Sequence, residues 1–142
     1  MMAAADEVCR SRALRLTDIR RQVLAALVAT HKPMGAYELI DALAAQGHKR
    51  LAPVSIYRAL DFLSEQGFVH KLASRNAFIA CPHVHAPGEM VVFLICDTCG
   101  GVDETVSEDM SRSLSQLIAK EGFSPRTQVI ELSGACAHCR GA

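Results

Sequence analysis

Residues 54–80 read VSIYRALDFLSEQGFVHKLASRNAFIA, and this stretch decides the fold. Its first half has apolar residues at helical spacing, which predicts a helix over residues 54–66 that ends at Gly67. Its second half contains two short strand candidates, residues 68–72 and 77–80, on either side of a turn-prone Ser-Arg-Asn run. A helix followed by a hairpin that carries Arg and Lys is typical of a winged helix, in which the helix enters the DNA major groove. The alternative is an ordinary α+β core.

Two further helices are predicted upstream of this stretch. One begins near Thr17 and Asp18, both good N-caps, and continues with apolar residues at helical spacing through Val28. The other covers residues 36–46 and ends at Gly47. Together with the helix over residues 54–66, they form a compact helical trio.

Downstream, residues 81–88 contain two prolines and a glycine, so they cannot continue a helix or a central strand. We therefore expect an α+β protein with three parts: a winged-helix DNA-binding domain (residues 1–80), a hinge (81–88) and a small α/β module (89–142), whose size calls for stabilisation by a metal, by dimerisation or by both. In the last part, strands are predicted over residues 90–95, 102–106 and 126–132, and a helix over residues 107–120.

Charge divides the chain in the same way, although its 15 basic and 15 acidic residues give a net charge of zero. Residues 1–80 hold 11 Lys and Arg against 7 Asp and Glu, whereas residues 81–142 hold 4 against 8. A basic module favours phosphate contact, and an acidic one suits an interaction surface or a cation site. The longest apolar runs are seven residues each, too short to span a bilayer, and the N-terminus lacks the features of a secretory signal. We expect a cytoplasmic protein with no membrane partner.

Four of the six cysteines form two Cys-x-x-Cys pairs, Cys96 with Cys99 and Cys136 with Cys139, separated by 36 residues. Two such pairs can surround Zn²⁺ tetrahedrally, and four sulfurs leave no position for a catalytic water. The spacing therefore predicts a structural zinc site. A redox dithiol or an iron–sulfur cluster is the alternative use of this motif.

A second group of possible ligands mixes nitrogen, sulfur and oxygen donors, a set that suits Zn²⁺. Its members are His70, Cys81, His83, His85, Glu89 and Glu104. An ion bound by ligands from both domains would fix the hinge and act as a switch. The alternative is that His70 only caps the hairpin and Glu104 is a solvated charge. Cys9 is given no role, because we expect the N-terminal residues around it to be frayed. His138 is given no role either, because four cysteines already complete the neighbouring zinc site.

Several segments resemble the Fur family of metal-responsive repressors, most closely its zinc uptake regulator branch. They are Arg15-Leu16-Thr17, Ile56-Tyr57-Arg58-Ala59-Leu60-Asp61-Phe62-Leu63, Glu65-Gln66-Gly67-Phe68-Val69-His70-Lys71 and Ile95-Cys96-Asp97-Thr98-Cys99-Gly100. The likeness covers nearly the whole chain, and these motifs are specific in combination.

The resemblance implies a homodimer that binds double-stranded operator DNA when loaded with zinc and controls zinc uptake genes. It implies one structural and one regulatory zinc ion per chain, the latter held by His70, Cys81, a hinge residue and Glu104. The ungapped hinge position is Glu89, with His83 and His85 as alternatives. The chain departs from the family pattern at Asp18, where the family has proline, and it lacks a His-rich tail after Cys139.

From the residues alone, Tyr57 and Arg58 could be a packed aromatic and a solvated charge, but the resemblance makes them candidates for base contacts. Arginine suits guanine O6 and N7. Supporting DNA contacts are predicted at Tyr37, Arg20, Lys71 and Arg75. No enzymatic activity and no small organic substrate are expected. The rival readings are an iron or peroxide sensor of the same family, a small zinc enzyme that uses His70, Cys81 and Glu104, and a thiol switch at Cys81.

Overall fold

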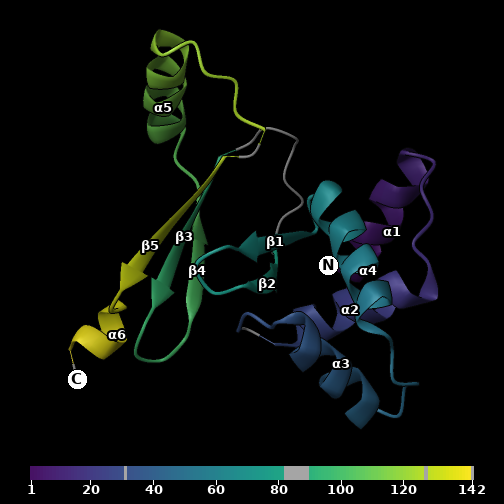
Figure 1. Ribbon diagram of the computed structural model, residues 1–142. Helices are drawn as coiled ribbons and strands as arrows, with labels where there is room; N and C mark the ends of the chain where they lie inside the picture. Colours follow the sequence, from purple (N-terminus) through teal and green to yellow (C-terminus); the bar gives the residue numbers. More distant parts are fainter. Residues whose placement is uncertain (31, 82–89, 127, 142) are drawn as a thin grey trace. The chain divides into compact units, whose positions relative to one another are not determined.

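A computed structural model describes residues 1–30, 32–81, 90–126 and 128–141. The chain divides into two compact units, Met1–Pro87 and Gly88–Ala142 (Figure 1). Except for Cys81, the predicted hinge at residues 81–88 lies outside the described residues, so the hinge stays a prediction.

The first unit has the predicted winged-helix order of helices followed by a hairpin. Its elements are α1 (Met2–Ser11), α2 (Asp18–Ala29), α3 (Ala36–Ala45), α4 (Pro53–Glu65), β1 (Val69–Leu72) and β2 (Ala77–Ala80). One hydrophobic core joins the apolar faces of the helices to the base of the hairpin, and Leu24, Leu39, Ile56, Leu60 and Phe68 are fully or almost fully buried in it. The periodic apolar positions of the sequence therefore form the core.

The boundaries of these helices follow from local chemistry. The Thr17 hydroxyl accepts a hydrogen bond of 3.4 Å from the Arg20 N–H and caps α2. Pro53 occupies the first turn of α4, where its missing N–H costs nothing. Gly67, with φ of +79°, turns the chain from α4 into β1. Helix α4 thus begins at Pro53, one residue before the predicted start, and Gly67 follows its end as predicted.

The hairpin is antiparallel, with His70 opposite Ile79 and Lys71 opposite Phe78. A single further bridge pairs Phe78 with Met34, which precedes α3; the two backbone hydrogen bonds are 2.9 and 2.8 Å long. This bridge ties the hairpin to the start of α3, a link between distant segments that hydrophobic periodicity does not reveal.

The expectation of a frayed N-terminus is wrong, because residues 2–11 form α1 with Ala5 and Cys9 buried. Two long-range contacts hold this helix in place. Arg21 of α2 donates to both carboxylate oxygens of Asp6, at 2.5 and 3.0 Å, and Arg12 donates to the Gln66 side chain at 3.0 Å. Tertiary packing therefore orders a segment for which the sequence predicts a frayed start.

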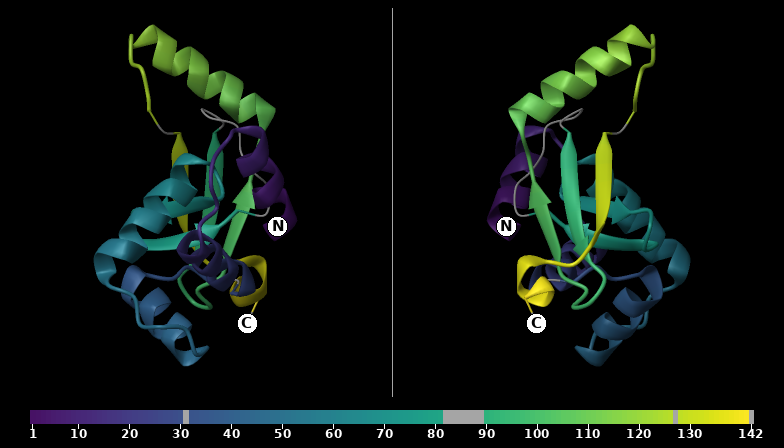
Figure 2. Two further views of the ribbon diagram at one scale, coloured as in Figure 1. Left: turned by 90° about the vertical axis from the view of Figure 1, so that its right-hand side faces the viewer. Right: turned by 90° about the vertical axis from the view of Figure 1, so that its left-hand side faces the viewer.

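The second unit is a three-stranded sheet with two helices. Its elements are β3 (Val91–Cys96), β4 (Val102–Thr105), α5 (Glu108–Lys120), β5 (Val129–Gly134) and α6 (Ala137–Arg140). The strand order is β4-β3-β5, with β4 antiparallel and β5 parallel to β3. Figure 2 shows α5 beyond one end of these strands and α6 beyond the other. The predicted small α/β module is present.

The last strand begins and ends later than the predicted residues 126–132. Its pairing with β3 runs from Val91 opposite Val129 to Cys96 opposite Gly134. The reason is the parallel register, which extends β5 as far as the cysteine that ends β3. No described helix combines the length and apolar character that crossing a membrane requires.

Candidate metal centres and nucleic-acid interface

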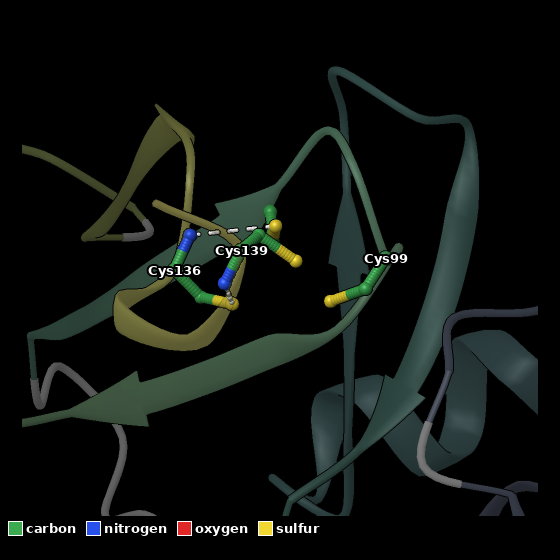
Figure 3. Close-up of side chains that lie close together, drawn as sticks. Cys99, Cys136 and Cys139 are labelled. Carbon is green, nitrogen blue, oxygen red and sulfur yellow. Dashed lines mark hydrogen bonds between the residues drawn. The ribbon is translucent and has the colours of Figure 1, made fainter. Parts of the chain in front are cut away.

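The four cysteines of the two pairs come together in the second unit. Cys96 ends β3, Cys99 lies in the turn before β4, Cys136 caps α6 and Cys139 lies within that helix. Their four sulfur atoms all lie within 4.8 Å of one another. Figure 3 shows the sulfur atoms of Cys99 and Cys139 directed toward each other. The parallel register of β5 and β3 is what brings the second pair beside the first.

Backbone N–H groups surround these sulfurs. The N–H of Cys136 donates to Cys96 Sγ, that of Cys139 to Cys136 Sγ and that of Gly101 to Cys99 Sγ, each at 3.4 Å. Such donors stabilise a thiolate over a thiol. The backbone therefore favours the thiolate form of Cys96, Cys99 and Cys136, which is the form that binds a metal ion.

The backbone N–H groups of Cys99 and Cys136 lower the pKa of the Cys96 thiol to about 6. The pKa of the Cys139 thiol changes in the opposite direction. Its hydrogen bond with the Cys136 side chain is the main cause and desolvation the second, and together they raise this pKa to about 12. Four sulfurs at this separation cannot all ionise without a compensating cation. A divalent ion that accepts four thiolates would supply that charge, so the donors fit Zn²⁺.

Gly101 also supports this cluster, although the cysteine motifs of the sequence do not include it. A Cβ atom built at this position would lie 3.3 Å from Cys99 Sγ, a tight contact. The available signal was the Gly-Gly pair that directly follows Cys99. The absence of a side chain at residue 101 lets the backbone N–H approach the sulfur.

In the first unit, the structure brings His70 and Cys81 together. His70 lies on β1, and Cys81 follows β2 directly, with its N–H bonded to the Phe68 carbonyl at 3.0 Å. One side-chain nitrogen of His70 and the Cys81 sulfur lie within 4.8 Å of each other, and Cys81 is fully buried. The hairpin thereby places one nitrogen and one sulfur donor side by side.

The other predicted regulatory ligands are Glu104 and the three hinge candidates. Glu104 lies on β4 of the second unit, opposite Phe93 of β3. The three candidates for the hinge ligand, His83, His85 and Glu89, lie outside the described residues. His138 lies in α6 beside Cys139, outside both groups of ligands.

Most of the predicted DNA contacts are exposed on the first unit. Tyr57 and Arg58 lie on the exposed face of α4, and Tyr37 of α3 is 65% exposed. Arg75 lies in the hairpin turn, and the Lys71 ammonium lies 5.9 Å from the centre of the Phe78 ring. Aromatic and cationic groups therefore lie on the surface of α4 and of the hairpin, the elements that contact nucleic acid in winged-helix proteins.

Arg20 differs from this group because its guanidinium already has partners within the unit. It lies 3.6 Å from the centre of the Phe62 ring of α4 and donates to the Arg15 carbonyl at 2.6 Å. Cation–π and hydrogen-bond contacts of this kind fix a side chain in place. Arg20 therefore joins α4 to the segment that precedes α2.

Comparison with known proteins agrees with this geometry. The model of the ferric uptake regulator family matches residues 11–133. The zinc uptake regulation protein of Escherichia coli (strain K12) is 40% identical over 139 residues, which is 98% of this chain and 81% of that protein.

Two solved structures extend the likeness to three dimensions. A zinc uptake regulator complexed with zinc and DNA matches with a TM-score of 0.89 and 39% identity, covering 99% of this chain and 93% of that one. Holo XcZur matches with a TM-score of 0.89 and 42% identity, covering 99% and 97%. On the family match and the sequence identity over almost its whole length, the chain belongs to the ferric uptake regulator family.

Proposed function

We propose that this chain is a zinc-responsive transcriptional repressor, which binds operator DNA as a homodimer when loaded with zinc and controls genes of zinc uptake. The observation that carries the proposal is the match, at a TM-score of 0.89 over 99% of the chain, to a zinc uptake regulator complexed with zinc and DNA. A DNA-binding regulator of this kind acts in the cytoplasm and catalyses no reaction.

In this proposal, the four cysteines hold one structural zinc ion per chain. Four thiolates saturate the ion, so it holds the turn after β3 and the start of α6 together and does no chemistry. The mutual proximity of the sulfurs and the backbone donors around them support this role.

The regulatory zinc ion binds His70 and Cys81 in this proposal, with Glu104 and one of His83, His85 and Glu89 as the remaining ligands. The support is the placement of one nitrogen and one sulfur donor within 4.8 Å at the end of the hairpin. A thiolate with imidazole selects Zn²⁺ over the harder Mg²⁺ and Mn²⁺. If zinc binds one arrangement of the two units more tightly than the others, zinc binding increases the population of that arrangement. In this proposal, the ion controls DNA binding in this way.

The experiment that tests the function is fluorescence anisotropy on DNA duplexes that the zinc-loaded protein selects from a randomised pool. We expect tight, sequence-specific binding in buffered free zinc and much weaker binding when a chelator lowers free zinc. Equal binding under both conditions would contradict zinc control. A response to Fe²⁺ or Mn²⁺ without one to Zn²⁺ would assign the chain to the iron or peroxide sensors instead.

Cys81→Ser tests the regulatory site. Native mass spectrometry is expected to show that this variant keeps one tightly bound zinc ion per chain and loses the second, reversible one. Its DNA binding is expected to lose zinc dependence. Cys9→Ala is the matched control, because it removes a buried thiol that belongs to neither group of ligands. A Cys81→Ser protein that still binds two ions and responds fully to zinc would exclude Cys81 as a ligand.

A further inference from the structure

Val54, in the first turn of α4, is an aliphatic residue that is exposed and does not contribute to the hydrophobic core. Its side chain is 61% exposed, whereas Ile56, Leu60 and Leu63 of the same helix are fully buried. Among the described residues of the first unit, three large hydrophobic side chains are exposed: Tyr37, Val54 and Tyr57. Val54 is the one aliphatic residue of these three, and unlike the two tyrosines it has no hydroxyl group that could form a hydrogen bond with water.

The helical register places Val54 on the same face as the predicted base contacts. Residues 54, 57, 58 and 61 follow the spacing i, i+3, i+4 and i+7, and all four are exposed. Val54 precedes Tyr57 by one turn, nearer to the N-terminus of the helix. In helix-turn-helix recognition, the N-terminal residues of the helix in the major groove contact base edges.

The chemistry of this first turn also suits a nucleic-acid surface. Asp18 and Glu38 lie in the first turns of α2 and α3, but the first turn of α4 contains no acidic residue. A carboxylate there would favour the helix dipole but repel phosphate. Valine in its place is a poorer helix former than most residues, so helix stability does not account for it.

We propose that Val54 is a specificity-determining residue that recognises thymine through contact with the C5 methyl group in the major groove. Valine offers only methyl groups, and among the four bases only thymine presents an apolar group in that groove. The inference rests on the proposed function, since it requires that α4 enters operator DNA. It adds to the hydrogen-bonding contacts of Arg58 an apolar contact that selects A·T pairs at a neighbouring position.

Deoxyuridine substitution tests this contact, because it removes the methyl group and leaves base pairing unchanged. The zinc-loaded full-length protein first selects its operator from randomised duplexes. Each thymidine is then replaced in turn by deoxyuridine, and the dissociation constants of the wild-type protein and of Val54→Ala are measured. At one or two thymines in each half-site, we expect the replacement to weaken wild-type binding by about fourfold, the factor for losing contact with one methyl group. At the same thymines, Val54→Ala should bind both duplexes equally.

Glu65→Ala, an exposed change in the last turn of the same helix, is the control and should retain the wild-type response to deoxyuridine at every position. Val54→Ala should unfold at the wild-type temperature or above, since alanine is the better helix former. If the wild-type protein selects an operator but no deoxyuridine effect depends on residue 54, the thymine contact is wrong and the repressor function stands. If the wild-type protein selects no sequence, both proposals fall.

Discussion

Arg58 is the residue whose loss should change DNA recognition most directly. It is exposed on α4, and its planar guanidinium can donate two hydrogen bonds to guanine O6 and N7. Arg58→Ala is expected to cost about 1–3 kcal/mol of operator affinity and to relax sequence preference. Anisotropy on the selected operator and on duplexes with single G·C replacements measures both effects. An unchanged affinity and footprint would remove Arg58 from the list of base contacts.

Ala13 is a residue at which the backbone, and not the side chain, sets stability. It follows α1 with φ of +54°, a left-handed conformation that alanine adopts at a cost and glycine adopts freely. The side chain is exposed, so its removal loses little packing. The left-handed conformation costs alanine about 1–2 kcal/mol, which outweighs the cost of about 0.5–1 kcal/mol that comes from the flexibility of glycine. Ala13→Gly should therefore stabilise the protein by about 0.5–1 kcal/mol, measured by chemical denaturation of the zinc-loaded protein.

Ala4→Gly provides the opposite-sign control, because Ala4 is an exposed residue inside α1. Glycine at that position should destabilise the protein by about 1 kcal/mol. If both substitutions destabilise, the conformation of residue 13 is not the origin of the effect.

At the scale of elements, α1 depends on the Asp6–Arg21 contact with α2. The Arg21 guanidinium lowers the pKa of the Asp6 carboxyl from its usual value of 3.8. A lowered folded-state pKa means that the carboxylate stabilises the fold above the unfolded-state pKa, and that this contribution is lost as pH falls through the folded value. Since pH 6 and pH 8 both lie above the usual carboxyl pKa, the contact contributes fully at both values. Asp6→Asn should therefore speed amide hydrogen exchange in α1 by the same factor, relative to the wild-type protein, at pH 6 and at pH 8.

Glu7→Gln is the matched control on the same helix. Glu7 pairs with Arg10 within α1, at 2.7 Å, and both side chains are largely exposed. Exposed pairs of this kind contribute little, so exchange in α1 should stay near the wild-type rate. Equal acceleration by both substitutions would show that Asp6 acts on the helix alone and not through its contact with α2.

The elements that the sequence predicts well are those whose signals are local. Apolar periodicity and the caps Thr17, Gly47 and Gly67 define α2, α3 and α4 within about one or two residues, and the Cys-x-x-Cys spacing predicts the four-sulfur cluster. The elements that it misses depend on distant partners. Helix α1 needs Arg21 and Gln66, the Met34–Phe78 bridge joins segments far apart, and the register of β5 is set by β3.

At the scale of the whole molecule, α5 carries the apolar face through which we expect the proposed homodimer to form. None of its residues is buried within the chain, yet Met110, Leu114, Leu117 and Ile118 line one face. Leu117 is 56% exposed, and Leu132 of β5 is 54% exposed. Apolar surface of this extent on one small unit indicates an interface with a second copy.

Leu117→Glu is expected to shift the protein from dimer toward monomer, because it places a charge within the apolar face. Sedimentation equilibrium at several concentrations measures the shift. Gln116→Glu adds the same charge on the opposite side of α5 and should leave the dimer intact. A Leu117→Glu protein that remains a dimer at the wild-type concentration range would place the interface elsewhere.

Zinc removal should affect the two units unequally, because their cores differ in size. In the first unit, one cluster of buried residues spans four helices and the hairpin. In the described part of the second unit, the buried side chains are Met90 and five residues of β3. So small a core needs a further source of stability, and a structural zinc ion supplies about 10–16 kcal/mol in zinc-finger peptides. When a strong chelator removes the bound zinc, we expect β3 and β5 to lose amide-exchange protection while α2 and α4 keep theirs. Cys136→Ser should reproduce this pattern in the presence of zinc, whereas Cys81→Ser should not. Equal loss of protection in α2 and β3 would mean instead that the two units unfold as one cooperative body.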